Sequence, residues 1–449
     1  MGYKKLGKDI LLMVIGNFAS KIVVFLILPL YTAYLTTSDY GTADLITTTC
    51  TLLFPLFTVI IGESMMRFAL DKSNNHSEIY SIGITVWLIG TILFLVISPI
   101  IRIVPSLKDY YWYLVIYYVT YSLQNTLSYF IRGIDKVKVY AIGGILNTFV
   151  LVFLNVIFLV QFKLGLKGYL YAYIITGAFM CFWWGIAGGL YKLKLNLRCQ
   201  NKSLKRKMLL YSIPMVPNSL SWWISNSSDK YILLYFSGVA VNGIYSVAYK
   251  IPTIITTVNN IFMSAWRLSS VEEFGTEKSK LFWNDIFKKF VSLMMCTTSL
   301  ILVFNKFLAG VLYSNEFYGA WKFVPVLVMA SVLQSYSEFF GTVYLAAIKT
   351  RMLFYSTGIG AISNIILNIV LIPKYAALGA GIATMCSYGI TFLIRIYKSR
   401  EIMKIEIIYL RAVICYGAIA LQVILYLPHS QASCLVYMFT APLLAQYAM

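Results

Sequence analysis

The sequence predicts an all-α membrane protein that crosses the bilayer about 14 times. First, 59% of the 449 residues are hydrophobic and only 12% are charged, and the mean hydropathy is +0.76. Second, apolar runs of about 20 residues, the length of one membrane-spanning helix, recur along the chain. Third, Lys and Arg gather in alternate connections between these runs, as the positive-inside rule describes.

Each apolar run is interpreted as one spanning helix. The predicted centres, in chain order, are Val23, Leu53, Thr91, Tyr121, Phe153, Phe179, Trp222, Ile254, Leu300, Met329, Ile362, Gly389, Ala418 and Phe439. The last run contains Pro442, so a surface hairpin is the alternative there.

The basic residues predict the orientation. If the N-terminus is cytoplasmic and each run crosses once, 27 of the 37 Lys and Arg residues fall on the cytoplasmic side and 7 on the other. The remaining three, Lys21, Lys230 and Lys250, fall inside runs. One missing or extra helix would invert the pattern partway along the chain, so the distribution supports both the count and the orientation.

Composition excludes several other classes of protein. The net charge of +20 is spread between apolar runs rather than gathered on one face, so nucleic acid is not an expected partner. The seven cysteines form no C-x-x-C pair, and only two histidines are present, so neither a metal site nor a disulfide framework is expected. No Walker A motif occurs, and no cofactor is predicted.

An internal repeat predicts the domain organisation. A shift of 213 residues places Lys136 on Lys349, Asn155 on Asn368 and Gly168 on Gly381 without a gap, which indicates duplication. We therefore predict two parallel six-helix lobes followed by two C-terminal helices. The predicted N-lobe covers 1–195, the C-lobe 196–400 and the last two helices 401–449.

Polar side chains inside the predicted spans are the candidate site residues, because an ionisable group there usually faces protein or water. Lys21 and Lys250 have no acidic residue one turn away in the same helix, so we predict a polar cavity around them. The alternative for Asp229 and Lys230 is that they pair with residues on a neighbouring helix and only fix packing. The uncharged residues expected to line the cavity are Asn17, Gln124, Asn125, Asn260 and Gln334.

Five short segments, taken in order, resemble a known family. They are residues 38–41 (SDYG), the prolines Pro214 and Pro217, residues 229–233 (DKYIL), 243–250 (GIYSVAYK) and the glycine-rich 378–384 (LGAGIAT). Their order and the helix plan resemble the polysaccharide repeat-unit flippases, which translocate O-antigen and capsule units. That family shares the MOP superfamily with the multidrug and toxic compound extrusion (MATE) transporters and the lipid II flippase.

The resemblance implies a function and a location. The chain would carry undecaprenyl-diphosphate-linked oligosaccharides from the cytoplasmic to the outer leaflet of a bacterial inner membrane, by alternating access, for lipopolysaccharide O-antigen or capsule. Membrane lipids, a glycan polymerase and chain-length proteins would be its partners. The diphosphate would be compensated by Lys21, Lys250, Lys230 and Arg267. Asp44, Asp229 and Glu338 are the candidates for ion coupling.

Two other functions are considered. A multidrug or cation antiporter of the same superfamily would need acidic residues for cationic drugs, and the three cavity cations disfavour it. A membrane glycan polymerase or ligase, which is an enzyme, would be expected to carry a long outer loop with catalytic groups. No predicted outer loop is long, so we expect a transporter and not an enzyme.

Overall fold

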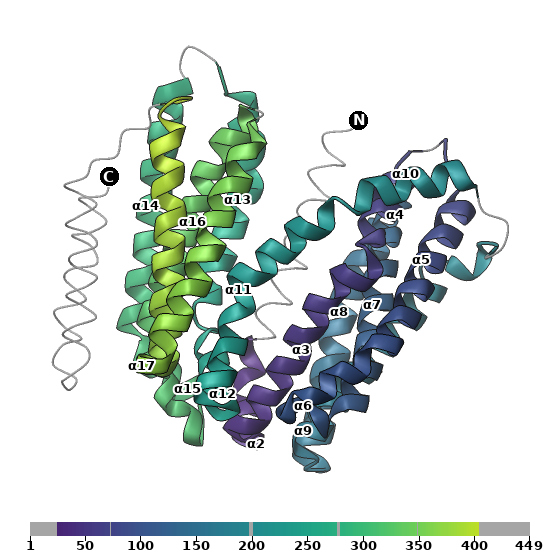
Figure 1. The fold of residues 1–449 in the computed structure, drawn as a ribbon, viewed down its shortest axis with the longest axis horizontal. Helices are drawn as coiled ribbons and strands as arrows, with labels where there is room; N and C mark the ends of the chain where they lie inside the picture. Colours follow the sequence, from purple (N-terminus) through teal and green to yellow (C-terminus); the bar gives the residue numbers. More distant parts are fainter. Residues whose placement is uncertain (1–24, 72, 197–200, 276–278, 348, 404–449) are drawn as a thin grey trace. The chain divides into compact units, whose positions relative to one another are not determined.

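The computed structural model describes residues 25–71, 73–196, 201–275, 279–347 and 349–403, and within these ranges the secondary structure is entirely helical. Figure 1 shows the helices in chain order. Contacts divide the chain into two compact units, residues 1–227 (unit 1) and 228–449 (unit 2). The division falls inside one helix and not at the predicted boundary of 195/196, so the assignment of the lobes stays a prediction.

Unit 1 contains long helices joined by short ones. Its elements are α2 (Leu28–Tyr34), α3 (Thr37–Thr58), α4 (Ile61–Ala69), α5 (His76–Ile97), η1 (Ser98–Ile103), α6 (Pro105–Lys108), α7 (Tyr111–Gly133), α8 (Val137–Asn155), the π-helix η2 (Val156–Gln161), α9 (Gly165–Ile186), η3 (Leu190–Lys192), α10 (Lys202–Ser212) and the first part of α11 (Met215–Ser237).

Local chemistry sets both ends of α3. Its start is a capping box, in which the Asp39 backbone N–H donates to Thr36 Oγ1 at 3.1 Å and the Thr36 N–H donates to Asp39 Oδ2 at 3.2 Å. Its end is a bend of 60° into α4, where Val59 and Ile60 both have φ of 52°. β-Branched residues rarely adopt this left-handed conformation, so the surrounding packing must hold the bend.

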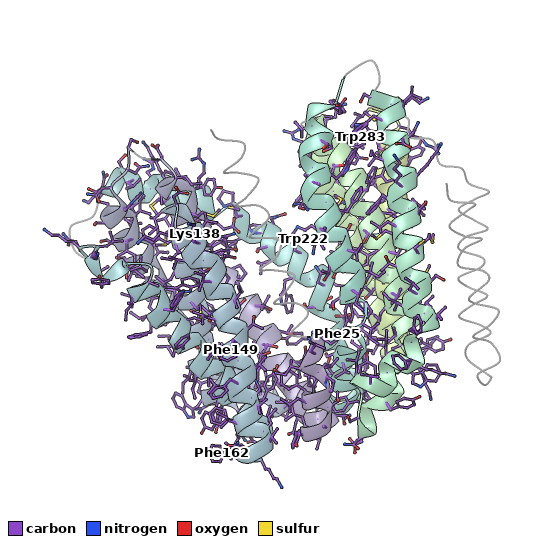
Figure 2. All side chains as sticks on the ribbon, turned by 180° about the vertical axis from the view of Figure 1, so that it is seen from behind. Phe25, Lys138, Phe149, Phe162, Trp222 and Trp283 are labelled. Atoms are coloured by element: carbon purple, nitrogen blue, oxygen red, sulfur yellow. The ribbon has the colours of Figure 1, made fainter. Side chains whose placement is uncertain are left out.

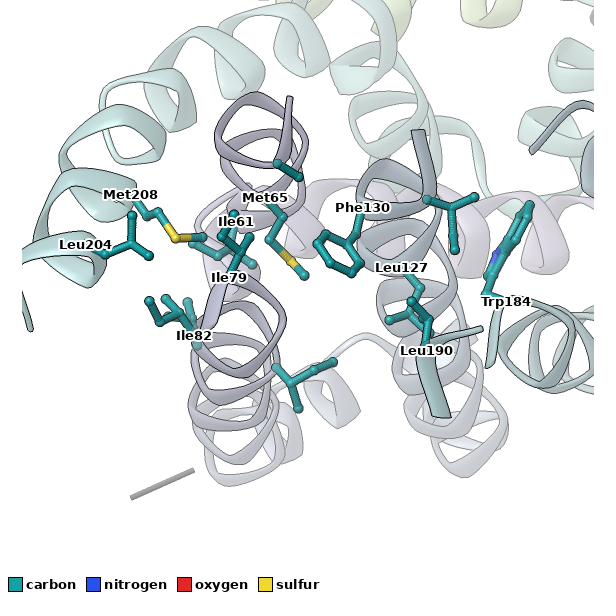
Figure 3. Close-up of a cluster of buried hydrophobic side chains, with 14 of the residues drawn as sticks. Ile61, Met65, Ile79, Ile82, Leu127, Phe130, Trp184, Leu190, Leu204 and Met208 are labelled. Atoms are coloured by element: carbon teal, nitrogen blue, oxygen red, sulfur yellow. The ribbon is translucent and has the colours of Figure 1, made fainter. Parts of the chain in front are cut away.

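An apolar cluster holds α4, α5, α7, α9 and α10 together in unit 1 (Figure 3). Ile61 and Met65 from α4 lie against Phe130 of α7 and Met208 of α10, and all four are fully buried. A short basic helix, α10, is therefore part of the core of unit 1.

Gly90 marks the closest approach of α5 to α3, because a Cβ there would overlap the backbone carbonyl oxygen of Phe57. We predict that Gly90→Ala lowers the free energy of unfolding by about 1–3 kcal/mol, since the backbones would have to separate. Gly144→Ala is the matched control, because no atom lies within 4 Å of its Cβ position. Thermal unfolding of the purified variants checks this, and equal midpoints would contradict it.

Unit 2 is built around a long bent helix. Its elements after α11 are α12 (Val239–Ala248), α13 (Thr253–Glu272), α14 (Ser279–Val303), α15 (Asn305–Leu312), η4 (Asn315–Lys322), α16 (Val324–Ala346) and α17 (Thr350–Ser399). A kink at Ala376 (φ 47°, ψ −127°), just after Pro373, divides α17 into two arms. Both the proline and this conformation are incompatible with a continuous helix.

Aromatic packing forms the core of unit 2. The Trp266 ring stacks on Phe339 at 5.0 Å between centroids, and Trp283 packs edge-on to Trp266 at 4.7 Å. Trp283 is completely buried, whereas Phe149 and Phe162 of unit 1 are 66% and 62% exposed (Figure 2). Large apolar side chains exposed in this way suit a lipid environment.

Six described helices are long and apolar enough to cross a membrane, or seven if the bent pair α3 and α4 is one span. The all-helical polytopic prediction is confirmed, and every predicted centre from Leu53 to Gly389 lies in a helix. The continuous span predicted around Ile254 is wrong, because the chain leaves the helix between Ala248 and Thr253. Pro252 lacks the N–H that a helix interior requires. The predicted centres Val23, Ala418 and Phe439 lie outside the described residues.

Candidate functional site

The predicted site residues of unit 1 lie on two helices. Asp44 is half-buried in α3, near Tyr40. In α7, Gln124 donates from Nε2 to Asn147 Oδ1 of α8 at 3.1 Å, and Asn125 donates to the Tyr121 carbonyl of its own helix at 2.8 Å. Gln124 therefore links α7 to α8, whereas the Asn125 amide bonds within its own helix. Lys21 and Asn17 lie outside the described residues.

Sequence reasoning missed a tryptophan that binds two threonines of α3, Thr48 and Thr51. Trp223 Nε1 donates to the Thr48 carbonyl at 3.2 Å and to Thr51 Oγ1 at 3.3 Å. An indole N–H in an apolar setting needs such a partner. The first part of α11 is thus attached to α3 within unit 1.

A buried carboxylate forms the centre of the candidate site in unit 2. Asp229 in α11 is 3% exposed and accepts hydrogen bonds from the Tyr245 hydroxyl at 2.7 Å and from the Lys230 backbone N–H at 2.9 Å. Tyr249 and Tyr388 lie within electrostatic reach of the same carboxylate. The structure therefore brings together α11, the α12–α13 break and the second arm of α17.

A chain of amides and hydroxyls extends beside it. Ser228 donates to Asn364 Oδ1 at 3.2 Å, Asn368 Nδ2 donates to the same oxygen at 2.9 Å, and Asn364 Nδ2 lies 3.4 Å from Thr384 Oγ1. Within the described part of the chain, Asn368 Oδ1 is buried with no hydrogen-bond partner. Such an orphaned oxygen is a place where a water or a cation can bind. The same holds for its repeat partner Asn155, whose Oδ1 is buried with no hydrogen-bond partner among the described residues while its Nδ2 donates to the Leu151 carbonyl of α8 at 2.7 Å.

The candidate cations of unit 2 lie in different surroundings. Lys230 is half-buried next to Asp229 and has a polar partner. Lys250 is half-buried in the break between α12 and α13, and no ion pair or hydrogen bond of its ammonium group is found among the described residues. Arg267 is exposed on α13.

Glu338 lies in a second polar group, on α16. Its Oε2 accepts a hydrogen bond from Asn259 Nδ2 of α13 at 2.7 Å, and the charges of Arg267 and Arg395 act on it. Asn259 is buried, whereas the adjacent Asn260, which was predicted to line the cavity, is exposed. Gln334, one turn before Glu338, is half-buried.

Arg395 is a buried cation, although it is one of the 27 basic residues that the positive-inside rule places on the cytoplasmic side. It is 5% exposed. Its guanidinium donates to the Ser337 carbonyl of α16 at 2.7 Å, to Ser356 Oγ at 3.0 Å and to Thr357 Oγ1 at 2.9 Å. Arg395 therefore joins α16 and both arms of α17.

No group of three or more His, Cys, Asp or Glu side chains suited to a metal ion occurs among the described residues. The buried carboxylate, the orphaned amide oxygen and the broken helix are instead features of membrane transporters. In those proteins, irregular backbone and ionisable groups occur where they line a solute or ion path.

Comparison with known proteins identifies the family. The model of a family described as "Polysaccharide biosynthesis protein" matches residues 6–267, more than half of the chain, and the chain belongs to this family. It is 22% identical over 228 residues to the probable low-salt glycan biosynthesis flippase Agl15 of Haloferax volcanii, an alignment that covers 50% of this chain and 48% of that protein. The match thus spans about half the length of that relative. An uncharacterized membrane protein of Methanocaldococcus jannaschii, MJ1375, is 22% identical over 291 residues, 61% of this chain and 67% of that protein.

Solved structures confirm the fold. The lipid II flippase MurJ in an inward closed conformation superimposes with a TM-score of 0.73 at 13% identity, covering 98% of each chain. An inward-facing MATE family transporter of the MOP superfamily gives 0.63 at 12% identity, covering 85% of this chain and 95% of that one. A MOP superfamily transporter from Pyrococcus furiosus gives 0.54 at 13% identity, covering 88% and 96%. The chain is a multi-pass membrane protein with the fold that these solved structures share.

Proposed function

We propose that this protein flips lipid-linked oligosaccharide repeat units across a membrane, as a transporter and not as an enzyme. The observation that carries the proposal is Lys250, a half-buried cation in a break between two helices of a protein from a polysaccharide biosynthesis family. An intramembrane ionisable residue with no protein partner is expected to serve a substrate. The relative whose name describes a glycan flippase supports the same class of substrate.

Electrostatics favour an anion at Lys250. The residue lies three positions before the first residue of α13, a helix of 20 residues, and a helix N-terminus carries roughly half a positive charge. These two positive charges repel each other, and a phosphate group would relieve that repulsion. Lys230 and Lys21 are proposed to contact the same diphosphate, and Arg267 is proposed to meet it at the inner mouth.

The finer assignment follows the resemblance. The proposed lipid carrier is undecaprenyl diphosphate, and the proposed route runs from the cytoplasmic to the outer leaflet of a bacterial inner membrane, with the N-terminus cytoplasmic. Two lobes, 1–195 and 196–400, would alternate access to the substrate. O-antigen and capsule are the proposed products, and a glycan polymerase and chain-length proteins are the proposed partners in the pathway.

Asp229 is proposed to couple flipping to an ion gradient, because a buried carboxylate beside hydroxyls and an orphaned amide oxygen can bind Na⁺ or a proton. Asp44 and Glu338 are the alternative coupling groups, and Asn17, Gln124, Asn125, Asn260 and Gln334 are the proposed polar lining. We expect Asp229→Asn to remove at least about 90% of the gradient-driven acceleration of flipping in proteoliposomes, since the amide cannot change charge.

Asp285→Asn is the control for this substitution, because Asp285 is an exposed carboxylate paired with Lys289 on α14. It should leave the dependence on Na⁺ and proton gradients unchanged. An Asp229→Asn protein that keeps its full gradient response would exclude Asp229 as the coupling group. The same test on Asp44→Asn and Glu338→Gln would then identify the group that replaces it.

The antiporter alternative is tested by deletion of the gene. The flippase proposal expects lipid-linked repeat units to accumulate on the cytoplasmic face while sensitivity to cationic drugs stays the same. A change in drug sensitivity without a change in the lipid pool would favour the multidrug or cation antiporter. A polymerase or ligase would instead leave single repeat units accessible on the outer face.

A further inference from the structure

The short helix α10 has one buried face and one exposed face along its length. Its inner face, formed by Leu204, Met208 and Ser212 at intervals of four residues, is buried in unit 1. The outer face, which we define as Lys202, Arg206, Lys207, Leu210 and the following Ile213, is exposed. The buried stripe packs against unit 1, and the outer face of the helix stays available for another contact.

Contacts fix α10 to α4, so that its outer face has a defined direction. Ser64 of α4 donates from Oγ to the Met208 carbonyl at 3.0 Å. The Tyr211 ring packs edge-on to Phe68 of α4, with 6.2 Å between centroids. Earlier in the chain, the Asn196 N–H donates to Ser81 Oγ of α5 at 2.9 Å. Figure 1 shows α10 lying beside the end of α4.

The outer face changes in character along the helix. Its first half is cationic, with Lys202, Arg206 and Lys207 all exposed. Its end is apolar, with Leu210 62% exposed and Ile213 52% exposed. A helix that enters a bilayer obliquely from the phosphate layer needs this order, with cations at the headgroups and aliphatic groups in the acyl chains.

We propose that the outer face of α10 binds the phosphate headgroups of anionic phospholipids in the adjacent leaflet. The distance from Lys202 to Ile213 is about 16 Å along a helix axis, enough for a tilted helix to pass from the phosphates into the hydrocarbon. Charge complementarity selects anionic over zwitterionic lipid, and the apolar end adds attraction that depends little on the headgroup.

Arg67 lies outside this surface even though it is exposed at the end of α4. Its charge acts on Asp71 in the following loop. Two hydrogen bonds, from the Ser73 hydroxyl at 2.7 Å and from the Ser73 N–H at 3.0 Å, lower the pKa of the Asp71 carboxyl. The charge of Arg67 lowers this pKa further. Asp71 is therefore negatively charged at neutral pH and offsets part of the Arg67 charge. The three cations of the outer face have no acidic residue within α10.

Native mass spectrometry of the purified full chain tests the proposal, with dioleoyl phosphatidylglycerol and dioleoyl phosphatidylcholine added separately. We expect the unaltered protein to bind phosphatidylglycerol more tightly. The triple variant Lys202→Gln, Arg206→Gln, Lys207→Gln should bind it at least tenfold more weakly, since each basic residue near an anionic surface contributes about fivefold. Binding of phosphatidylcholine should stay within about twofold.

The matched control is Lys280→Gln, Lys288→Gln, Lys289→Gln in α14, which removes the same charge from three exposed lysines. An equal loss in this control would show that only net charge matters and would overturn the proposal. The proposal would also be overturned if the triple variant of α10 retained full binding of phosphatidylglycerol. A further variant, Leu210→Gln with Ile213→Gln, should weaken the binding of both lipids equally. Loss of phosphatidylglycerol binding alone would contradict the proposed contact of Leu210 and Ile213 with the acyl chains. Lipid binding is measured without any glycan, so a negative result for the lipid proposal would not count against the flippase proposal.

Discussion

Replacing Lys21 and Lys250 together by Ala is expected to stop production of surface glycan while folded protein remains in the membrane. Each lysine would make a charge-assisted hydrogen bond to the diphosphate worth about 1.5–3 kcal/mol. Loss of both should slow flipping by roughly 100-fold or more, since every 1.4 kcal/mol is a factor of ten. Quantification of surface polysaccharide, with the amount of protein measured in the same membranes, checks this.

The control for the lysine pair is Lys280→Ala with Lys288→Ala, because both side chains are exposed on α14. That protein should produce a normal amount of glycan. Normal surface glycan in the Lys21 and Lys250 double variant would exclude these two residues as the cations that accompany the diphosphate.

Substitution of Arg395 by Met is expected to reduce the stability of unit 2 by about 3 kcal/mol or more, because removing one member of a buried polar network leaves its partners unsatisfied. The partners are the Ser337 carbonyl, two hydroxyls of α17 and the charge of Glu338. Arg395→Lys retains the charge but not the planar guanidinium with its several N–H donors, so it should recover only part of the lost stability. Thermal unfolding in detergent measures both variants.

Arg351→Met is the matched control for Arg395. Arg351 is also on α17 but is exposed, so its loss should change the free energy of unfolding by less than about 0.5 kcal/mol. If the two methionine variants unfold at the same temperature, Arg395 does not hold α16 and α17 together.

Hydropathy and the placement of basic residues predicted the long helices between α3 and α17, but not short helices such as α6, α10 and α15. These signals depend on the cost of burying charge in lipid, which acts residue by residue along the chain. The break before α13 also has a local signal, since Pro252 cannot continue a helix. It was missed because the apolar run continues across the proline, and Lys250 was therefore placed in the middle of one span.

The partners of the site residues could not be predicted in the same way. Neighbouring residues on a helix point about 100° apart, so sequence alone did not separate Asn259, which binds Glu338, from the exposed Asn260. Arg395 has the sequence pattern of a residue at the end of a span. Its burial depends on Ser337 and Ser356, which are 58 and 39 positions away in the sequence. Only tertiary packing brings these groups together.

The most direct measurement of the central claim uses the purified full chain in proteoliposomes that contain a fluorescent undecaprenyl-diphosphate-linked oligosaccharide. A membrane-impermeant reagent that destroys the fluorophore reports how much glycan lies in the outer leaflet. The flippase account predicts that oligosaccharide from the inner leaflet becomes accessible at a rate that increases with the amount of protein and falls in the Lys21 and Lys250 double variant. The account would be contradicted if folded, reconstituted protein left the oligosaccharide no more accessible to the reagent than in protein-free vesicles.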